Sequence, residues 1–256
     1  MQTAGVDQSE AILYQLMEIG ELLLTSGAEV NRVEDTLIRM GKAYGAERMN
    51  VFVITSSVIV TMIFPEGKEF TQTRRIMSPG GTDFTRIEAL NALSRRCCEE
   101  ELSLQQLAEE VQKIKNHTSS DRIFYMGSIL AAASFAVFFG GSPADALAAA
   151  AGAVVICASQ NVLGPIAPNH VIYQLLCSLV CGVAIGIMAL FVPAIHMDKV
   201  MIGDIMLLIP GIAMTNAVRD ILVGDTISGM MRLIETFLWA GALACGFMVS
   251  IWLIGG

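Results

Sequence analysis

The sequence contains few charged residues for its length. Only 16% of its 256 residues are Asp, Glu, Lys or Arg, whereas soluble domains carry about 25%. Hydrophobic residues make up 54%, and the mean hydropathy is +0.60. The formal net charge is −8, and no basic patch is interleaved with aromatic residues. This composition excludes an ordinary soluble domain and argues against a nucleic-acid partner.

The sequence also lacks the patterns of metal, cofactor and catalytic sites. The three histidines, His117, His170 and His196, lie in separate segments, and no nucleophile–base pair or metal-ligand spacing is present. The six cysteines form no C-x-x-C pair, which is typical of reduced thiols used as small apolar residues. No glycine-rich phosphate loop is found. We therefore expect no catalytic residue, no metal, no cofactor and no enzyme activity.

The few charges are unevenly distributed along the chain. Residues 1–118 contain 17 acidic and 12 basic side chains, and residues 119–256 contain 7 and 4, which gives the totals of 24 and 16. This contrast predicts two domains, a polar one over 1–118 and a membrane domain over 119–256. The first residues do not resemble a signal peptide, so we expect the polar domain to remain in the cytoplasm.

The polar domain has the periodicity of a small α+β fold. Apolar residues at helical spacing predict two helices before residue 45, with Gly27 ending the first. A region rich in Val, Ile, Thr and Phe follows and predicts a three-stranded antiparallel sheet. Its strands are expected near 50–56, 58–64 and 69–77. Two more helices are expected near 83–98 and 103–116, the second opened by a capping box at Ser103.

The membrane domain contains five apolar segments, each near the ~20 residues that a helix needs to cross a bilayer. They lie near 122–140, 144–160, 170–192, 199–218 and 230–254. The positive-inside rule sets their orientation. Seven basic residues fall on one side with this arrangement, and only Lys199 falls on the other. They are Arg95, Arg96, Lys113, Lys115, Arg122, Arg219 and Arg232. We expect a membrane protein with a cytoplasmic N-terminal domain and an external C-terminus.

The fourth apolar segment contains a carboxylate and a proline. Asp204 lies within it, and Pro210, followed by Gly211, removes a backbone hydrogen bond and favours a kink. Broken spans with freed backbone groups are typical of substrate and ion sites in transporters. Asp204 also stands five residues after Lys199, as a residue at the membrane surface would. The sequence leaves both positions for Asp204 open.

The stretch from 210 to 235, PGIAMTNAVRDILVGDTISGMMRLIE, is unusually charged for its apolar surroundings. An ionised side chain at a bilayer centre costs roughly 2.5–3.5 kcal/mol, so these groups lie at the membrane surface or face a polar cavity. Gly224 and Asp225 resemble the start of a helix, with Asp225 or Thr226 as its cap. The five ionisable residues are Arg219, Asp220, Asp225, Arg232 and Glu235.

This stretch resembles the signature of the bacterial threonine/serine exporter family. Two N-terminal segments, SGAEVNRVEDTLIRMGKAYG and RRIMSPGGTDFTRIEALNALSRR, resemble the cytoplasmic domain of that family, and the resemblance covers nearly the whole chain. Members that export threonine as one chain carry a second membrane half, whereas this chain has five predicted spans. It is similar to the large subunit of the split, two-component form, which works with a smaller membrane protein.

The resemblance implies two sets of motif positions. In the cytoplasmic domain they are Gly27, Arg32 and Glu34. In the membrane domain they are Pro210, Gly211, Asn216, Arg219, Asp220, Gly224, Asp225, Gly229, Arg232 and Glu235. The prolines and glycines of this second set are expected to form kinks or hinges, and its polar residues, with Asp204, a substrate and proton pathway.

We therefore hypothesise a subunit of a secondary transporter that exports threonine- or serine-type amino acids and is driven by the proton motive force. Arg219 or Arg232 would bind the substrate carboxylate. Asp204, Asp220 or Glu235 would carry the coupled proton, and Asp225 would be mainly structural. The expected partners are a smaller membrane subunit, further copies in an oligomer, a small-molecule substrate and the lipid bilayer.

Two other functions stay open at this point. The split form of the family includes exporters of dicarboxylates such as succinate, so the family name does not fix the substrate. A membrane-anchored sensor or scaffold is the second alternative, and it would tolerate neutral replacement of the membrane charges.

Overall fold

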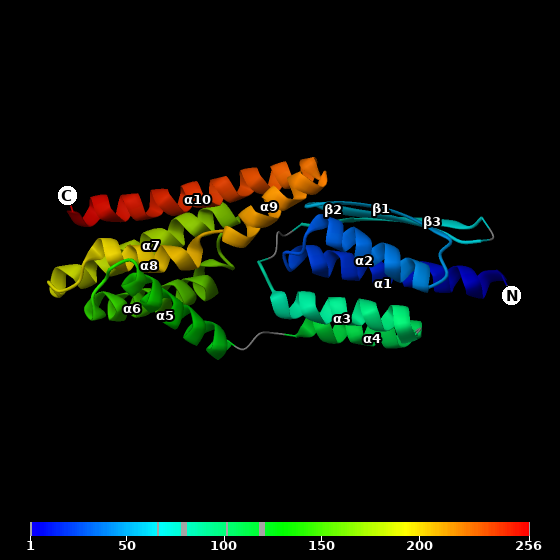
Figure 1. Cartoon of the computed structure of the whole chain (residues 1–256), viewed down its shortest axis with the longest axis horizontal. Coiled ribbons are helices and arrows are strands. Elements are labelled where there is room, and N and C mark those ends of the chain that lie inside the picture. Colours follow the sequence, from blue (N-terminus) through cyan, green and yellow to red (C-terminus); the bar gives the residue numbers. More distant parts are fainter. Residues whose placement is uncertain (1, 66, 78–80, 101, 118–120, 256) are drawn as a thin grey trace. The chain divides into compact units, whose positions relative to one another are not determined.

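The computed structural model describes residues 2–255 except 66, 78–80, 101 and 118–120. Part of the RRIMSPGGTDF motif (78–80) and the predicted domain boundary (118–120) thus lie outside the described residues. Figure 1 shows a mainly helical chain with one small sheet. The elements are α1 (Gln2–Thr25), α2 (Val30–Ala43), β1 (Arg48–Ile54), β2 (Ser57–Ile63), β3 (Glu69–Arg75), α3 (Phe84–Glu100), α4 (Leu104–Asn116), α5 (Asp121–Phe138), α6 (Pro143–Leu163), α7 (His170–Phe191), α8 (Met197–Leu208), α9 (Gly211–Val223) and α10 (Thr226–Gly255).

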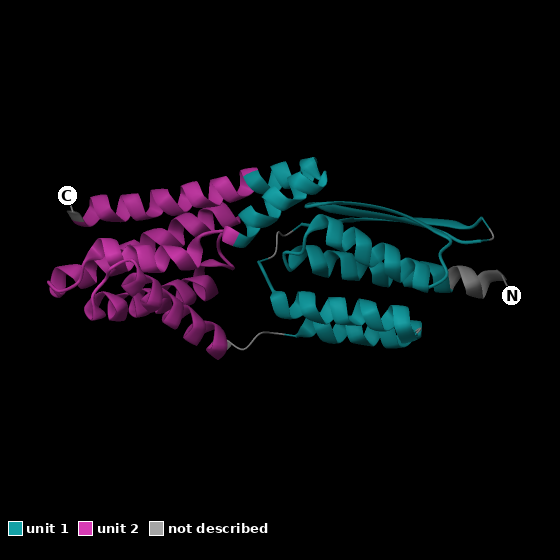
Figure 2. Ribbon diagram, in the orientation of Figure 1, with its two compact units in different colours: residues 1–118, 212–233 teal, residues 119–211, 234–256 magenta. Residues whose placement is uncertain are grey.

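The described residues form two compact units (Figure 2). Unit 1 comprises residues 1–118 and 212–233, and unit 2 comprises 119–211 and 234–256. Unit 1 therefore contains α9 and the first turns of α10 as well as the polar N-terminal region. Residues of α10 belong to both units. This helix is long: its 30 residues extend about 45 Å, which exceeds the ~30 Å of a bilayer's hydrocarbon core.

Unit 1 is built in layers around α1 and α2 (Figure 1). These two helices pack against the sheet on one side and against α3 and α4 on the other. The core is continuous through these layers and includes Leu16, Leu37, Val60, Leu90 and Leu107. The sheet has the order β1-β2-β3 with antiparallel pairing throughout. The predicted three-stranded antiparallel sheet is thus confirmed, and each strand lies within two residues of its expected position.

The turn between α1 and α2 positions several candidate residues. Gly27 has φ +86°, and the bonds from Gly27 N to Leu24 O and from Ala28 N to Leu23 O form a Schellman motif. This confirms the prediction that Gly27 ends the first helix. The predicted capping box at Ser103 is also present, with Gln106 as its partner.

The helices that could cross a membrane are identified by their length and composition. Among the described residues, α6, α7 and α10 are each long and apolar enough to cross a membrane, and α8 with α9 would count as a fourth, bent span. The apolar part of α5, residues 122–138, is shorter. The count by length and composition is therefore three or four helices, and the predicted count of five is not established.

The fourth apolar segment is broken at Pro210. The axes of α8 and α9 differ by 50°, and α8 alone, with 12 residues, extends only about 18 Å. Pro210 has no N–H for the carbonyl of Met206, and the N–H of Gly211 bonds Ile209 O instead of Leu207 O. The carboxyl end of α8 therefore presents backbone carbonyls that lack their usual helical donors.

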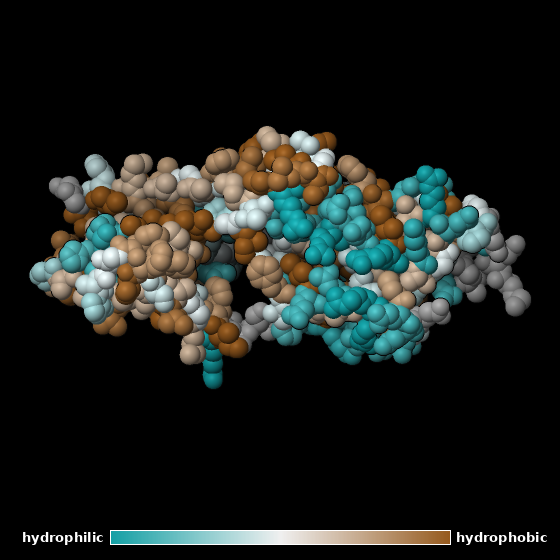
Figure 3. Space-filling model, viewed as in Figure 1, coloured by the Kyte–Doolittle hydropathy of each residue, from teal (hydrophilic) through white to brown (hydrophobic). Residues whose placement is uncertain are grey.

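Glycines allow α7 and α10 to approach closely within unit 2. A Cβ on Gly182 would lie 2.0 Å from Ser250 Oγ, and one on Gly246 would lie 1.9 Å from Ser178 Oγ. Gly186, which completes a GxxxG pattern with Gly182 on α7, also faces α10, since a Cβ there would lie 2.1 Å from Ile254 Cδ1, so this pattern serves helix packing. Figure 3 shows hydrophilic residues gathered over α2, α3 and α4 of unit 1, while hydrophobic residues cover much of the visible face of unit 2 and of α9 with the start of α10.

Candidate functional site

The candidate residues are divided between the two units. Unit 2 contains Asp204, Pro210, Gly211 and the half-buried Glu235. The others all lie in unit 1, where the N-terminal motif and the signature of α9 and α10 come together. They are Gly27, Arg32, Glu34, Asn216, Arg219, Asp220, Gly224, Asp225, Gly229 and Arg232.

The α1–α2 turn (residues 26–29) accepts three long-range contacts from α9 and α10. Asn216 donates its side-chain amide to Gly27 O at 3.0 Å. Arg219 forms an ion pair with Glu29, with Nη1 2.8 Å from Oε1. Arg232 donates to Ala28 O at 3.4 Å. Residues nearly 200 positions apart in the sequence thus meet at one turn.

Asp220 and Arg232 form the buried part of this cluster. Their side chains are 1% and 11% exposed, and Arg232 Nη1 lies 3.4 Å from Asp220 Oδ2. The backbone of Val30, the first residue of α2, also faces the Asp220 carboxylate. This position suits an anion, because the amino end of a helix carries partial positive charge. Neither oxygen of Asp220 has a hydrogen bond of good geometry among the described residues, so Arg232 is its main compensation.

Two glycines shape the helical hairpin formed by α9 and the start of α10. Gly224 has φ +103° and ends α9 in a Schellman motif, with Asp225 N bonded to Asp220 O. Gly229 lies where the two helices approach closely, since a Cβ there would be 2.5 Å from Ile221 Cγ1 and 2.7 Å from Ala217 O. Asp225 directly precedes α10, and its carbonyl accepts the bond from Gly229 N. Its Oδ2 is buried and has no hydrogen-bond partner among the described residues.

Glu34 connects α2 to the sheet edge. Its Oε1 accepts a hydrogen bond from Val53 N at 2.9 Å, which pairs an edge amide of β1. Burial raises the pKa of Glu34, and the nearby charges of Asp225 and Asp35 act in the same direction, against the Val53 hydrogen bond. Arg32, the neighbouring motif residue, is exposed. Glu34 is therefore the motif residue whose side chain bonds β1 and lies near the charge of Asp225.

Asp204 occupies the interior of unit 2. It is fully buried, its Oδ2 lies 3.6 Å from Cys181 Sγ, and its Oδ1 has no hydrogen-bond partner among the described residues. A Cβ on Gly152 would lie 1.8 Å from Oδ2, so this glycine provides the space for the carboxyl group. The Asp204 carboxyl therefore lies inside the helix bundle of unit 2, beside α6 and α7.

A model of the threonine/serine exporter family (ThrE) matches residues 15–254. The chain belongs to the threonine/serine exporter family. It is also 23% identical, over 264 aligned residues, to a protein named threonine/serine exporter from Corynebacterium glutamicum. That alignment covers 98% of this chain and 51% of the relative, so the chain spans about half the length of the relative. No solved structure matches the chain.

Sequence reasoning missed several buried polar residues of this exporter-family chain. Asp145 is fully buried at the start of α6, where it accepts bonds from Ser142 N and from His196 N and lies 3.1 Å from His196 Nδ1. Gln174 of α7 donates to Leu208 O at 3.0 Å. Polar residues inside apolar segments were the available signal, because buried polar groups need partners.

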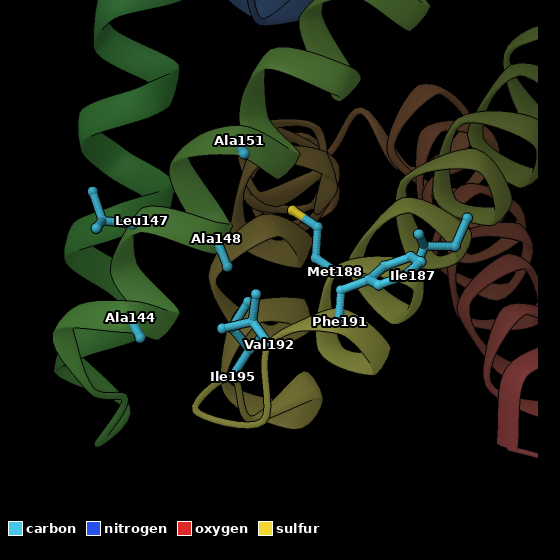
Figure 4. Close-up of a pocket in the computed structure, with 9 residues that line it drawn as sticks. All are labelled: Ala144, Leu147, Ala148, Ala151, Ile187, Met188, Phe191, Val192 and Ile195. Carbon is cyan, nitrogen blue, oxygen red and sulfur yellow. The ribbon is translucent and has the colours of Figure 1, made fainter.

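A wholly apolar pocket of about 440 Å³ lies elsewhere in unit 2 (Figure 4). Its walls come from α6, the end of α7 and the segment that follows α7. None of its lining residues is polar, so it offers no group to orient a zwitterionic molecule. They are Ala144, Leu147, Ala148, Ala151, Ile187, Met188, Phe191, Val192 and Ile195.

Proposed function

We propose that this membrane protein forms part of an exporter of small amino acids of the threonine and serine type. The observation that carries the proposal is the family match over residues 15–254. The name of the Corynebacterium relative agrees with it. The convergence of the N-terminal motif with the charged signature in unit 1 supports a substrate site there.

In the proposed topology the chain crosses the membrane five times. The 18 residues of α5 extend about 27 Å, close to the ~30 Å of hydrocarbon, so a short span is physically possible. The distribution of basic residues favours a cytoplasmic N-terminal region and an external C-terminus. Because the chain spans about half of its relative, a second, smaller membrane subunit would supply the other half in an oligomeric transporter.

Arg219 is the residue we propose to receive the substrate carboxylate. Its side chain is 57% exposed, and its present partner is the carboxylate of Glu29. A guanidinium can bind a substrate carboxylate through two hydrogen bonds, so the substrate can replace Glu29 at Arg219. Arg232 is different, because it is nearly buried and neutralises Asp220. We assign Arg232 to the structure of the cluster.

Asp204 is the residue we propose to carry the coupled proton. An ionised carboxylate that is buried without compensation costs several kcal/mol, and Asp204 Oδ1 has no hydrogen-bond partner among the described residues, so release of its proton requires a rearrangement around Asp204. Movement of one charge across 100 mV provides about 2.3 kcal/mol, enough to bias export. Glu235 is the second carboxylate to test for this role.

Efflux measurements on Arg219→Ala test the proposal. Cells or proteoliposomes containing the wild-type chain should export threonine and serine, whereas Arg219→Ala should raise the substrate concentration for half-maximal export about tenfold or more. Arg39→Ala is the matched control, because Arg39 is an exposed arginine of α2 outside the cluster. Succinate belongs in the substrate panel. Export of succinate but not of threonine would show that the substrate is a dicarboxylate and not an amino acid. If an abundant protein exported none of the tested compounds, a sensor or scaffold would be favoured.

A further inference from the structure

We propose that the broken end of α8 and the side chain of Gln174 form a binding site for the ammonium group of the exported amino acid. This inference rests on the proposed export of amino acids and adds a substrate-recognition site within unit 2. Neither the charged signature nor the cytoplasmic motif includes Gln174.

The carboxyl end of α8 supplies the first part of the site. The carbonyls of Met206 and Leu207 lack their usual helical donors, because Pro210 has no N–H and Gly211 N bonds Ile209 O. The carboxyl end of a helix also carries partial negative charge. Carbonyls that lack their helical donors are favourable partners for a cationic donor, and broken helices present them in several transporters.

Gln174 supplies the second part. Its side chain is 96% buried, since the residue is 4% exposed. Its Nε2 donates to Leu208 O, which fixes the amide at the end of α8. The Oε1 of the same amide has no hydrogen-bond partner among the described residues. A buried acceptor without a donor costs about 1–3 kcal/mol, so a ligand that brings a donor to Oε1 recovers this free energy.

The chemistry of the ligand follows from these groups. An ammonium has three donors and no acceptor, which matches the carbonyl oxygens of α8 and the amide oxygen of Gln174.

An aromatic contact lies close to Gln174. His170 is one turn before Gln174 on α7, and its ring contacts that of Trp239 on α10. His170 and Trp239 have ring centroids 4.4 Å apart, and His170 and Tyr173 have centroids 5.4 Å apart. Trp239 is therefore a natural reporter of binding near Gln174.

Fluorescence titration of the purified full-length chain tests the proposal. In a Trp252→Phe background Trp239 is the one remaining tryptophan, because the sequence has two. We expect saturable responses to L-threonine and to 1-amino-2-propanol, which keeps the amine but lacks the carboxylate. Gln174→Met should weaken the binding of both compounds about tenfold or more. 3-Hydroxybutyrate lacks the amine, so any response to it should be the same in the wild type and in Gln174→Met.

Two further variants separate binding from structure. Gln174→Glu keeps an acceptor but loses the donor to Leu208 O, so it should retain amine binding. A role limited to bonding Leu208 would instead impair Gln174→Glu and Gln174→Met equally, and that result would overturn the proposal even if Gln174→Met folds poorly. Ser178→Ala is the control, since Ser178 is equally buried one turn further along α7 and donates to its own helix. It should bind threonine normally.

The outcomes distinguish this inference from the proposed function. If the wild type exports and binds threonine but Gln174→Met binds it equally well, the site is wrong and the exporter stands. If the wild type responds to sodium or potassium ions and not to 1-amino-2-propanol, the site takes a metal cation and the ammonium assignment is wrong. If the wild type neither binds nor exports any amino acid, the proposed function fails and this inference fails with it.

Discussion

The two units hold their polar side chains in opposite ways. In unit 1 the charges are dense and mostly paired: Arg219 with Glu29, Arg232 with Asp220, and Asn216 with the carbonyl of Gly27. In unit 2 polar side chains are scarce, yet two of the buried ones, Asp204 and Gln174, each keep an oxygen with no partner among the described residues. Unpartnered buried oxygens also occur among the described residues of unit 1, on Asp220 and Asp225, but there an ion pair with Arg232 compensates Asp220.

This difference distinguishes polar groups that stabilise the structure from polar groups that suggest a ligand or a proton. Paired charges at the α1–α2 turn connect distant segments of the chain, and such contacts specify structure whether or not a substrate binds there. An unpartnered buried group costs about 1–3 kcal/mol, and no hydrogen bond to Asp204 Oδ1 or Gln174 Oε1 from the described residues of unit 2 recovers this cost. Such a group suggests a ligand or a proton that completes it.

The largest expected effect comes from breaking the pair in unit 1. Arg232→Ala leaves Asp220 buried without a cation, which should destabilise unit 1 by about 3–5 kcal/mol. Thermal unfolding of the purified chain, followed by circular dichroism, measures this change. Because the cost comes from the uncompensated carboxylate, the double variant Arg232→Met with Asp220→Leu should recover much of the stability. A single Arg232→Ala variant as stable as wild type would show that the pair is dispensable.

In unit 2 we expect loss of transport without loss of the fold. Asp204→Asn keeps the size of the side chain and should change stability by less than about 1.5 kcal/mol. Proton-coupled export should fall about tenfold or more, because the amide cannot bind and release the proton. The measurement is threonine efflux at several pH values, normalised to protein abundance. Normal efflux with its usual pH dependence would remove Asp204 from the mechanism.

Gly152 offers an independent test of the same position. A Cβ on Gly152 overlaps the Asp204 carboxyl, so Gly152→Ala must displace that side chain and should also reduce export. The matched control is Gly127→Ala in α5, where a Cβ meets nothing within 4 Å. If both glycine variants export equally, the packing around Asp204 has no part in transport.

Local periodicity predicted the elements of unit 1 well. Three strands, the helix end at Gly27 and the capping box at Ser103 all depend on short-range chemistry that the sequence contains directly. The grouping of residues 212–233 with the N-terminal region depends on long-range contacts, such as that of Asn216 with Gly27 O. Hydropathy alone places α9 in a membrane span, so it could not foresee this grouping.

The candidate site was predictable only in part. Charged residues in apolar surroundings drew attention to Arg219, Asp220 and Arg232, but not to their partners at the α1–α2 turn. Gln174 escaped notice because one amide in an apolar helix of 22 residues is an ordinary feature of a sequence. Its role becomes visible only when the end of α8 lies beside it.

The smallest expected effect concerns Glu34. Burial raises the pKa of its carboxyl, so the folded state binds this proton more tightly than the unfolded state does. Stability contributed by Glu34 is therefore present at low pH and is lost as pH rises through the raised pKa. Glu34→Gln keeps an acceptor for Val53 N and removes the charge, so it should match the wild type near pH 4 and slow amide exchange at Val53 modestly at pH 7. Faster exchange in the variant at pH 7 would mean that the ionised carboxylate stabilises the sheet edge, and that the charges of Asp225 and Asp35 matter less than the Val53 bond.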